Sequence, residues 1–303
     1  MSILTSRRHI LGSRKGTRVM VPFLVILFYF FVGITLAQKD DVSIGILAKR
    51  GAKQAFQRWQ PLANYLSKDL GLSFKIVPLS FSQLENYVAN GKVDLVLANQ
   101  VFFINLKRRF GASALATVKN RYGGPYMGGV IFVRSQSRIR TLEQLRGKKI
   151  GVVSLKSAGG FVIQASELMK HGVNVMKDCQ LKVFNNQDYV VYSVLNGIMD
   201  AGFVRTDQLE SMVREKKIRL DQFTVLNKRT YPNFKLLCST ALWPAWPLAA
   251  SKGLSIQLKR RITSSLVNMQ PTRSFKRATR ILGFIPPGDY SPVEAALQSL
   301  NML

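Results

Sequence analysis

Cysteine, histidine and acidic residues are scarce in this chain of 303 residues. It contains 2 Cys and 2 His, and only 16 Asp and Glu stand against 44 Lys and Arg. Two cysteines cannot form the disulfide network of a small secreted scaffold. No group of Cys, His and Asp has metal-site spacing, and neither a Gly-x-Ser-x-Gly nor a phosphate-loop motif occurs. We therefore expect no metal, no cofactor and no catalytic residue, and predict that the protein is not an enzyme.

The excess of basic residues gives the chain a formal net charge of +28 at pH 7. Such a charge can concentrate anionic ligands, bind nucleic acid or anionic lipid, or simply lie in solvent. The bases are spread in short groups, such as residues 107–109, 148–149 and 259–261. Because spread charge favours a solvated surface over a groove for a polyanion, we expect no specific nucleic-acid partner.

One long apolar run lies near the N-terminus. Residues 19–37 (VMVPFLVILFYFFVGITLA) are uncharged, and five bases and no acid precede them. A basic start, an apolar run and small residues before Gln38 predict a secretory signal over residues 1–37. The run is also long enough to cross a bilayer, so an uncleaved membrane anchor is the alternative. Both interpretations export everything after Ala37.

Two short signatures recur 106 residues apart. Residues 44–47 (IGIL) are echoed by 150–153 (IGVV), and residues 90–94 (NGKVD) by 196–200 (NGIMD). In each copy an apolar strand precedes a helical pattern, an Asn-Gly stop, and an Asp that leads a second apolar strand. The repeat predicts two similar α/β lobes with a ligand cleft between them.

Hydrophobic periodicity places strands and helices along both lobes. The first lobe is expected to comprise residues 42–128 and 235–303, and the second residues 129–234. Cys179 and Cys238 fall in predicted strands of different lobes, so we expect two buried thiols rather than a disulfide. The predicted strands are 42–48, 74–78, 94–98, 115–119, 130–134, 149–154, 180–184, 201–205, 223–226 and 236–242; the predicted helices include 53–70, 100–109, 160–170, 189–196, 206–215, 254–267, 274–282 and 292–303.

The strongest local site signal is residues 154–161 (SLKSAGGF), which leave a predicted strand and open a helix. In parallel sheets, ligands bind beyond the carboxyl ends of the strands, at helix N-termini. Glycines allow close backbone approach, and the first-turn N–H groups lack helical partners. Ser157, Ala158, Gly159 and Gly160 are therefore predicted to hold an anion. An ordinary capped helix with a glycine turn is the alternative.

Other polar loops leave strands at the same edge. Lys49 and Arg50 follow the first strand and could pair with the ligand or lie in water. Arg205 could form a bidentate clamp on an oxyanion, or a salt bridge to Asp207 or Asp188. The remaining candidates are the amide loop 185–189 with Gln187, the loop 99–103 with Asn99 and Phe103, the aromatic segment 243–247, and, for an enzyme on the same fold, Asp188 and Asp207. Asp94 and Asp200, which open their strands at the opposite end, are predicted to be structural.

An ordered set of motifs resembles the phosphonate-binding-like family of periplasmic solute-binding proteins. The resemblance is closer still to the periplasmic sensor domains of tetrathionate-sensing histidine kinases. The set runs from about residue 42 to 290 and comprises 45–51 (GILAKRG), 58–63 (RWQPLA), 128–132 (GGVIF), 145–148 (LRGK), 159–161 (GGF), 190–197 (VVYSVLNG), 204–206 (VRT), 239–240 (ST) and 243–247 (WPAWP).

The resemblance implies a type II periplasmic-binding-protein fold, with two lobes, two hinge crossings and an oxyanion ligand. It maps the anion site onto Ser157 to Gly160 and a cleft loop onto Asn99 to Phe103. The sensors tend to have Asn-Pro there, whereas this chain has Gln100 after Asn99. An exported receptor for phosphonate, phosphate or a sulfur oxyanion such as tetrathionate is the function implied. Because no kinase follows in this sequence, we expect it to serve a membrane permease of an ABC transporter or a separate sensor kinase.

Overall fold

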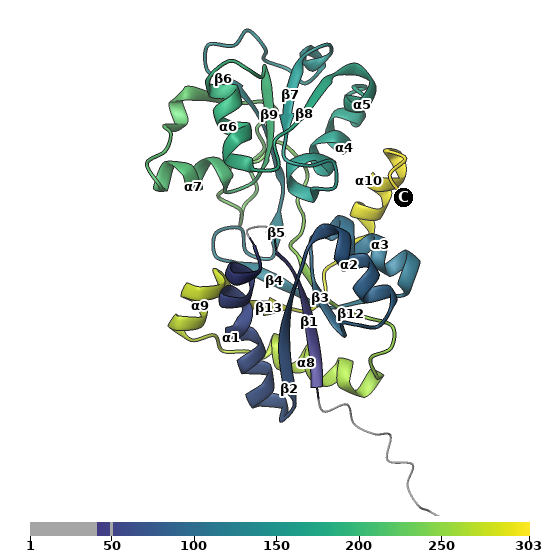
Figure 1. Ribbon diagram of the computed structural model, residues 1–303. Helices are drawn as coiled ribbons and strands as arrows, with labels where there is room; N and C mark the ends of the chain where they lie inside the picture. The colour runs from purple at the N-terminus through teal and green to yellow at the C-terminus, as the bar shows by residue number, and fades with distance from the viewer. Residues whose placement is uncertain (1–40, 49–50) are drawn as a thin grey trace, which may run out of the picture. The chain divides into compact units, whose positions relative to one another are not determined.

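The computed structural model describes residues 41–48 and 51–303 (Figure 1). The apolar run 19–37 and the two bases Lys49 and Arg50 lie outside these described residues. Among the described helices, none has the length and apolar character that a bilayer crossing requires.

The described chain folds into two open sheets and a short two-stranded connection. One sheet has the strand order β13-β4-β12-β3-β1-β2, and the other has β10-β6-β9-β7-β8. We call the parts built on them lobe 1 and lobe 2. The strands are β1 Asp41–Leu47, β2 Ser73–Leu79, β3 Leu95–Leu97, β4 Ser113–Asn120, β5 Tyr126–Met127, β6 Gly129–Arg134, β7 Lys149–Val152, β8 Gln180–Val183, β9 Ala201–Arg205, β10 Phe223–Val225, β11 Trp243–Pro244, β12 Pro247–Ala250 and β13 Ile281–Ile285.

Helices cover both faces of each sheet, because alternate strand residues point to opposite faces. In β3, Leu95 and Leu97 pack with α1, α8 and α9, whereas Val96 packs with α2 and α3. In lobe 2, α4 and α5 lie over one face and α6 and α7 over the other. The α-helices are α1 Ala52–Leu70, α2 Phe81–Ala89, α3 Gln100–Phe110, α4 Ile163–Lys170, α5 Val175–Asp178, α6 Gln187–Leu195, α7 Gln208–Arg214, α8 Ile256–Val267, α9 Arg273–Thr279 and α10 Ser291–Ser299; short 3-10 turns η1 Glu143–Leu145 and η3 Leu220–Gln222 and a π-helical turn η2 Ala158–Val162 complete them.

The sequence repeat is a repeat of structure. In β1–β3 Ile44 pairs with Leu95, and in β7–β9 the equivalent Ile150 pairs with Ala201. Asp94 Oδ2 accepts a hydrogen bond from the Ser43 amide at 2.8 Å, and Asp200 Oδ2 accepts one from the amide at the equivalent position 149 at 2.9 Å. Both aspartates therefore join neighbouring parallel strands, as predicted for structural residues.

Helix α10 connects the two lobes. It packs against α3 of lobe 1 and α4 of lobe 2, within an apolar cluster that both lobes share (Figure 1). Glu294 forms ion pairs with Lys107 and Arg108 of α3, at 3.1 and 3.0 Å. The buried Tyr290 hydroxyl donates to Ala245 O at 2.9 Å and lies 2.8 Å from Thr117 Oγ1. Burial raises the pKa of this phenol above its ordinary value.

Two predicted elements are wrong. Residues 236–242 form no strand: their side chains bond to β6 instead, with Ser239 Oγ accepting from Ile131 N at 2.9 Å and Thr240 Oγ1 from Gly129 N at 3.0 Å. The strands after this segment are β11, which pairs with β5, and β12. The helix predicted over 274–282 ends at Thr279, because Arg280 adopts a left-handed conformation and β13 follows.

Both cysteines are free, which confirms the prediction of two thiols. Cys238 is buried as expected, but Cys179 is only half-buried. Desolvation raises the pKa of both, that of Cys179 to about 11. Neither thiol therefore has the thiolate character of a nucleophile.

Candidate functional site

The predicted anion cradle, Ser157 to Gly160, opens a helix that continues through α4. Ser157 is the N-cap, and its Oγ accepts from Gly160 N at 3.2 Å. The next residues form a π-helical turn in which Val162 N donates to Ser157 O at 3.0 Å. Within the described chain, the N–H groups of Ala158 and Gly159 have no protein acceptor. This buried turn therefore presents unpaired amide dipoles, as the sequence predicted.

Glycine at position 159 allows the turn to approach the connection between the lobes. A Cβ there would collide with Met127 Cε of β5 and lie 3.0 Å from Arg205 Cβ. The helix start thus lies against both a crossing strand and the end of β9. At Gly160, a Cβ would collide with Val153 Cγ1 and lie 3.0 Å from Ser157 Oγ, which would disturb the cap.

Arg205 and Gln187 lie together at the end of β9. Gln187 Oε1 accepts from Arg205 N at 2.9 Å, which ties the start of α6 to that strand. Arg205 Nη1 donates to Thr206 O at 2.8 Å and lies 3.8 Å from Asp207 Oδ2. Asp207 makes its shorter ion pair, at 2.6 Å, with Arg214. The Arg205 side chain is 40% exposed, and its Cα and Cβ lie beside Gly159, so three of the predicted residues of lobe 2 meet at one place.

The lobe 1 candidates follow β3. Asn99 caps α3, with Oδ1 accepting from Phe102 N at 3.2 Å, and its buried Nδ2 has no partner in the described chain. Gln100 Nε2 donates to Pro244 O at 2.5 Å, and its buried Oε1 is likewise unpaired. Buried polar atoms normally have partners, so these two amides are unusual. Phe103 is 5% exposed and packs edge-on against Tyr290, at 5.0 Å between ring centroids, within the shared core.

Gln164 is a buried residue of the site that sequence reasoning missed. Its Nε2 donates to Gly159 O at 2.9 Å and to Val204 O at 2.8 Å, while Oε1 has no partner in the described residues. The side chain therefore holds the cradle against β9. The sequence did not indicate Gln164 because this residue lies in a helical pattern, where glutamine is common. Gln100 stood out only as a departure from the motif of the sensors.

The groups that could support catalysis are engaged elsewhere. Asp188 pairs with Lys217 at 2.9 Å, and Asp207 with Arg214. His171, the one histidine of the described residues, follows the opposite end of α4 from Ser157 and contacts Glu143 Oε1 at 3.0 Å. The described residues contain no group of His, Cys, Asp and Glu that could hold a metal.

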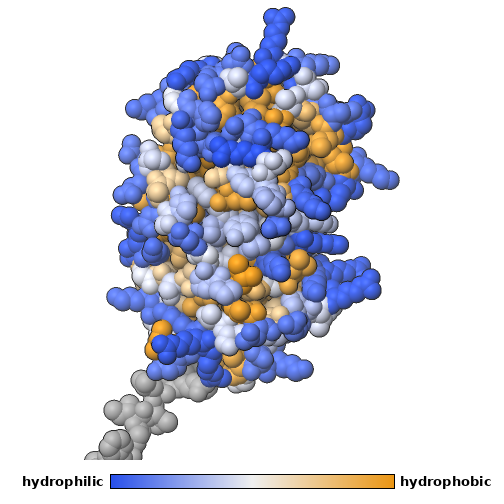
Figure 2. Space-filling view, turned by 180° about the vertical axis from the view of Figure 1, so that it is seen from behind, coloured by the Kyte–Doolittle hydropathy of each residue, from blue (hydrophilic) through white to orange (hydrophobic). Residues whose placement is uncertain are grey.

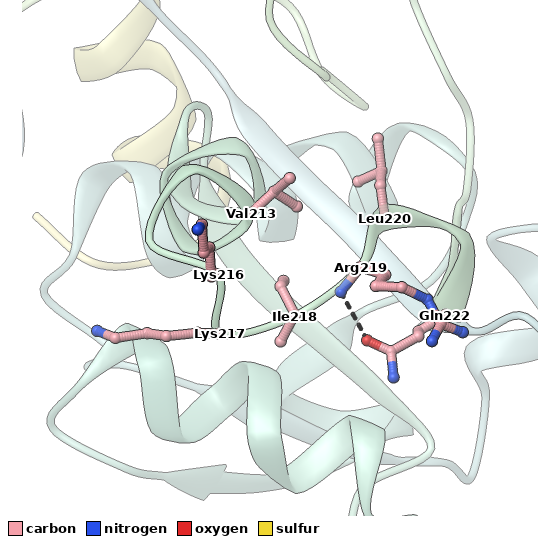
Figure 3. Close-up of a pocket in the computed structure, with 7 residues that line it drawn as sticks. All are labelled: Val213, Lys216, Lys217, Ile218, Arg219, Leu220 and Gln222. Carbon is pink, nitrogen blue, oxygen red and sulfur yellow. Dashed lines mark hydrogen bonds between the residues drawn. The ribbon is translucent and has the colours of Figure 1, made fainter.

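One cavity lies elsewhere on lobe 2 (Figure 3). Its volume is about 510 Å³, and none of the predicted site residues lines it. Two of its three bases are paired, Lys217 with Asp188 and Glu215 and Arg219 with Asp221, whereas Lys216 has no ion pair among the described residues. It is lined by Val213, Lys216, Lys217, Ile218, Arg219, Leu220 and Gln222.

Residues 44–293 match a protein family described as ABC transporter, phosphonate, periplasmic substrate-binding protein. A curated relative, the tetrathionate sensor histidine kinase TtrS of Salmonella typhimurium, is 32% identical over 265 residues. The match covers 86% of this chain but 43% of that kinase, so the chain spans less than half of its relative's length.

Solved structures share the fold at low sequence identity. XAC2383 from Xanthomonas citri bound to ATP has a TM-score of 0.70 and 18% identity, over 86% of this chain and 98% of that one. PhnD1 from Prochlorococcus marinus in complex with methylphosphonate has a TM-score of 0.67 and 15% identity, over 88% and 100%. These likenesses establish the type II periplasmic-binding-protein fold that the sequence predicted.

Proposed function

Because the chain belongs to the family of periplasmic substrate-binding proteins of phosphonate ABC transporters, we propose that it is an exported receptor for a small oxyanion. The ligand is a phosphonate, phosphate or sulfur oxyanion, held between the lobes and delivered to an ABC permease. The relative with a tetrathionate-sensing name supports one alternative, in which the ligand state is passed to a separate histidine kinase.

The observation that carries the proposal is the helix start at Ser157–Gly160, with two amide groups unpaired in the described chain beside Arg205. The helix dipole contributes only about 0.3–1 kcal/mol to anion binding. A micromolar ligand needs about 8 kcal/mol. Hydrogen bonds to a charged group contribute about 1.5–3 kcal/mol each, so several must converge. We assign them to the cradle, Arg205 and Gln187 from lobe 2.

Lobe 1 completes the proposed site through the loops after β1 and β3. Asn99 has a buried Nδ2 that can donate to an oxyanion, and Phe103 lies one turn further along α3, packed against Tyr290. Lys49 and Arg50 follow β1 and would add positive charge. An anion that contacts both lobes would favour the conformation in which they are closed. A permease or kinase that recognises the closed conformation would thereby detect the bound ligand.

A thermal-shift panel tests the proposal. The exported part is heated with phosphate, methylphosphonate, sulfate, thiosulfate or tetrathionate, and with chloride as the control. A ligand at 100 times its Kd adds about 2.7 kcal/mol, which corresponds to a rise in Tm of roughly 5–11 °C. No shift with any anion at millimolar concentration would contradict the proposal. Recovery of a chemically altered anion would instead indicate an enzyme on the same fold.

Ser157→Ala and Ser80→Ala form a matched pair of variants. Each removes an N-cap hydroxyl, at a cost of about 0.5–2 kcal/mol in stability. Only Ser157 lies in the proposed site, so only Ser157→Ala should weaken the selected anion, by about tenfold or more. If calorimetry gives equal anion affinities for the two variants, residues Ser157 to Gly160 do not bind the anion.

A further inference from the structure

One end of lobe 1 is basic where the chain enters the fold. We call it the basal face: the starts of β1, β2, β3 and β4 meet there with the end of β12, since Asp41 pairs with Ser73 and Ala250 with both Leu95 and Ser113. Helix α8 begins just after β12, at this end, and then packs against β4, β13 and α1 (Figure 1). The bases assigned to this face are Lys68 in the last turn of α1, Lys92 just before β3, Lys252 just after β12, and Arg260 and Arg261 in the first turns of α8.

Few acids balance these bases, although Asp69 follows Lys68 at the end of α1. Residues 222–288, which include α8, contain no Asp or Glu. Among the described residues, the five bases of the basal face form no ion pair, whereas Asp41 is already paired with Lys75 at 2.6 Å. Arg261 Nη2 donates to Leu70 O at 2.8 Å, which holds this guanidinium at the end of α1, and the stem of Lys252 lies near Gly111.

The basal face also carries an exposed apolar residue. Ile256, the first residue of α8, is 56% exposed, and it lies between Lys252 and Arg260 along the chain. Hydrophilic side chains dominate the rest of this end of the molecule, with small apolar patches among them (Figure 2). Bases around an apolar side chain are the combination that favours the interface of an anionic membrane over bulk water.

The covalent chain brings this face near a bilayer. The apolar run ends at Ala37, and β1 begins at Asp41. Four residues span at most about 14 Å, so a run that lies in the membrane would keep Asp41, at the edge of the basal face, within roughly one to two Debye lengths of the headgroups. We propose that the basal face of lobe 1 docks on the anionic lipid surface of the membrane through which the chain is exported. This inference rests on the export in the proposed function, but not on its ligand.

Docking in this orientation leaves the proposed ligand site accessible. The cradle and the start of α3 follow the carboxyl ends of their strands, whereas the basal face gathers the starts of β1, β3 and β4.

Vesicle co-sedimentation of the chain from Gln38 tests the docking without the apolar run. Both sheets and the four apolar clusters lie within residues 41–303, so this chain retains the folded part. We expect it to bind vesicles rich in phosphatidylglycerol and not vesicles of phosphatidylcholine, and to be released by salt. With about 1 kcal/mol, or fivefold, per basic residue, the triple variant Lys68→Gln, Lys252→Gln, Arg260→Gln should bind on the order of a hundredfold more weakly.

The matched control is a second triple on the same lobe, Arg273→Gln, Lys276→Gln, Arg277→Gln on α9. It also removes three positive charges, but near the N-terminal half of α1, where Arg58 Nε donates to Thr279 O of α9. We expect near wild-type vesicle binding from it, and unchanged anion-induced thermal shifts from both triples. Equal weakening by the two triples, no binding to the anionic vesicles, or tighter binding of the basal face to an oligonucleotide than to lipid would each overturn the docking. Loss of the anion response alone would affect only the ligand proposal.

Discussion

Replacing Leu297 by Ala tests whether α10 makes the two lobes one folding unit. Leu297 is fully buried in the apolar cluster that contains residues of α3, α4 and α10. Leu→Ala changes in cores cost about 2–5 kcal/mol, more where the cavity cannot collapse. Three elements, the two lobes and α10, line the cavity that Leu297→Ala would leave, and each can move to close part of it. We therefore expect a loss of about 3 kcal/mol in the free energy of unfolding, within this range. That loss lowers Tm by roughly 6–12 °C for a domain of this size.

Urea unfolding, monitored by amide hydrogen exchange, shows which elements lose stability. We expect β7 and β9 of lobe 2 and α3 of lobe 1 to lose protection together in Leu297→Ala, since both pack on the shared cluster. The control is Leu266→Ala, equally buried but in the cluster confined to lobe 1. It should destabilise lobe 1 first. If Leu297→Ala costs less than about 1 kcal/mol, or leaves lobe 2 protected as in the wild type, α10 does not couple the lobes.

Three further changes test other parts of the structure. Gly159→Ala places a Cβ 3.0 Å from Arg205 Cβ, so overpacking should lower stability by about 1–3 kcal/mol and weaken anion binding. Gly253→Ala is the control, since nothing lies within 4 Å of its new Cβ. In thermal-shift assays it should change neither the stability nor the response to anions. Tyr290→Phe removes the hydroxyl between Thr117 and Ala245 and should lower the free energy of urea unfolding by about 1–3 kcal/mol; a loss near zero would show that water replaces it. Hydrogen bonds from Thr141, its own amide and His171 lower the pKa of Glu143 to about 2, so its contribution to stability is present above pH 4.5 and lost as the pH falls toward 2. Thr141→Ala should raise that pKa, and a carboxyl titration by NMR that stays near 2 in the variant would contradict the assignment.

Local patterns predicted much of the fold because local interactions do form it. Ser80 and Gln83 make a reciprocal capping box that starts α2, and Asn-Gly ends the helix before the Asp that joins β3 to β1. The two-lobe repeat was visible because these short-range features recur at the same spacing. The segment 236–242 was misassigned because an apolar run does not show what it pairs with. Ser239 and Thr240 satisfy β6 through their side chains, a tertiary contact that periodicity does not reveal.

The candidate site was predictable only where loops carry it. The turn at Ser157–Gly160 has a composition that indicates close backbone approach, and the structure places it beside Arg205 and β5. Gln164 and the unpaired amide oxygen of Gln100 emerge only from burial, since both residues are unremarkable within helical segments. The role of Phe103 depends on α10, which lies almost 190 residues later and packs against it through Tyr290.

The π-helical turn at Ala158–Val162 carries one residue more than an α-helical turn would. Gln164, Ala165 and Leu168 keep their inward orientation, while the residues ahead of them are offset by a single position. Deleting one residue from the turn would restore ordinary pitch and rotate Ser157 about 100° around the helix axis. Paralogues that lack this extra residue would therefore present a different edge of the helix to their ligands, even with every other contact preserved.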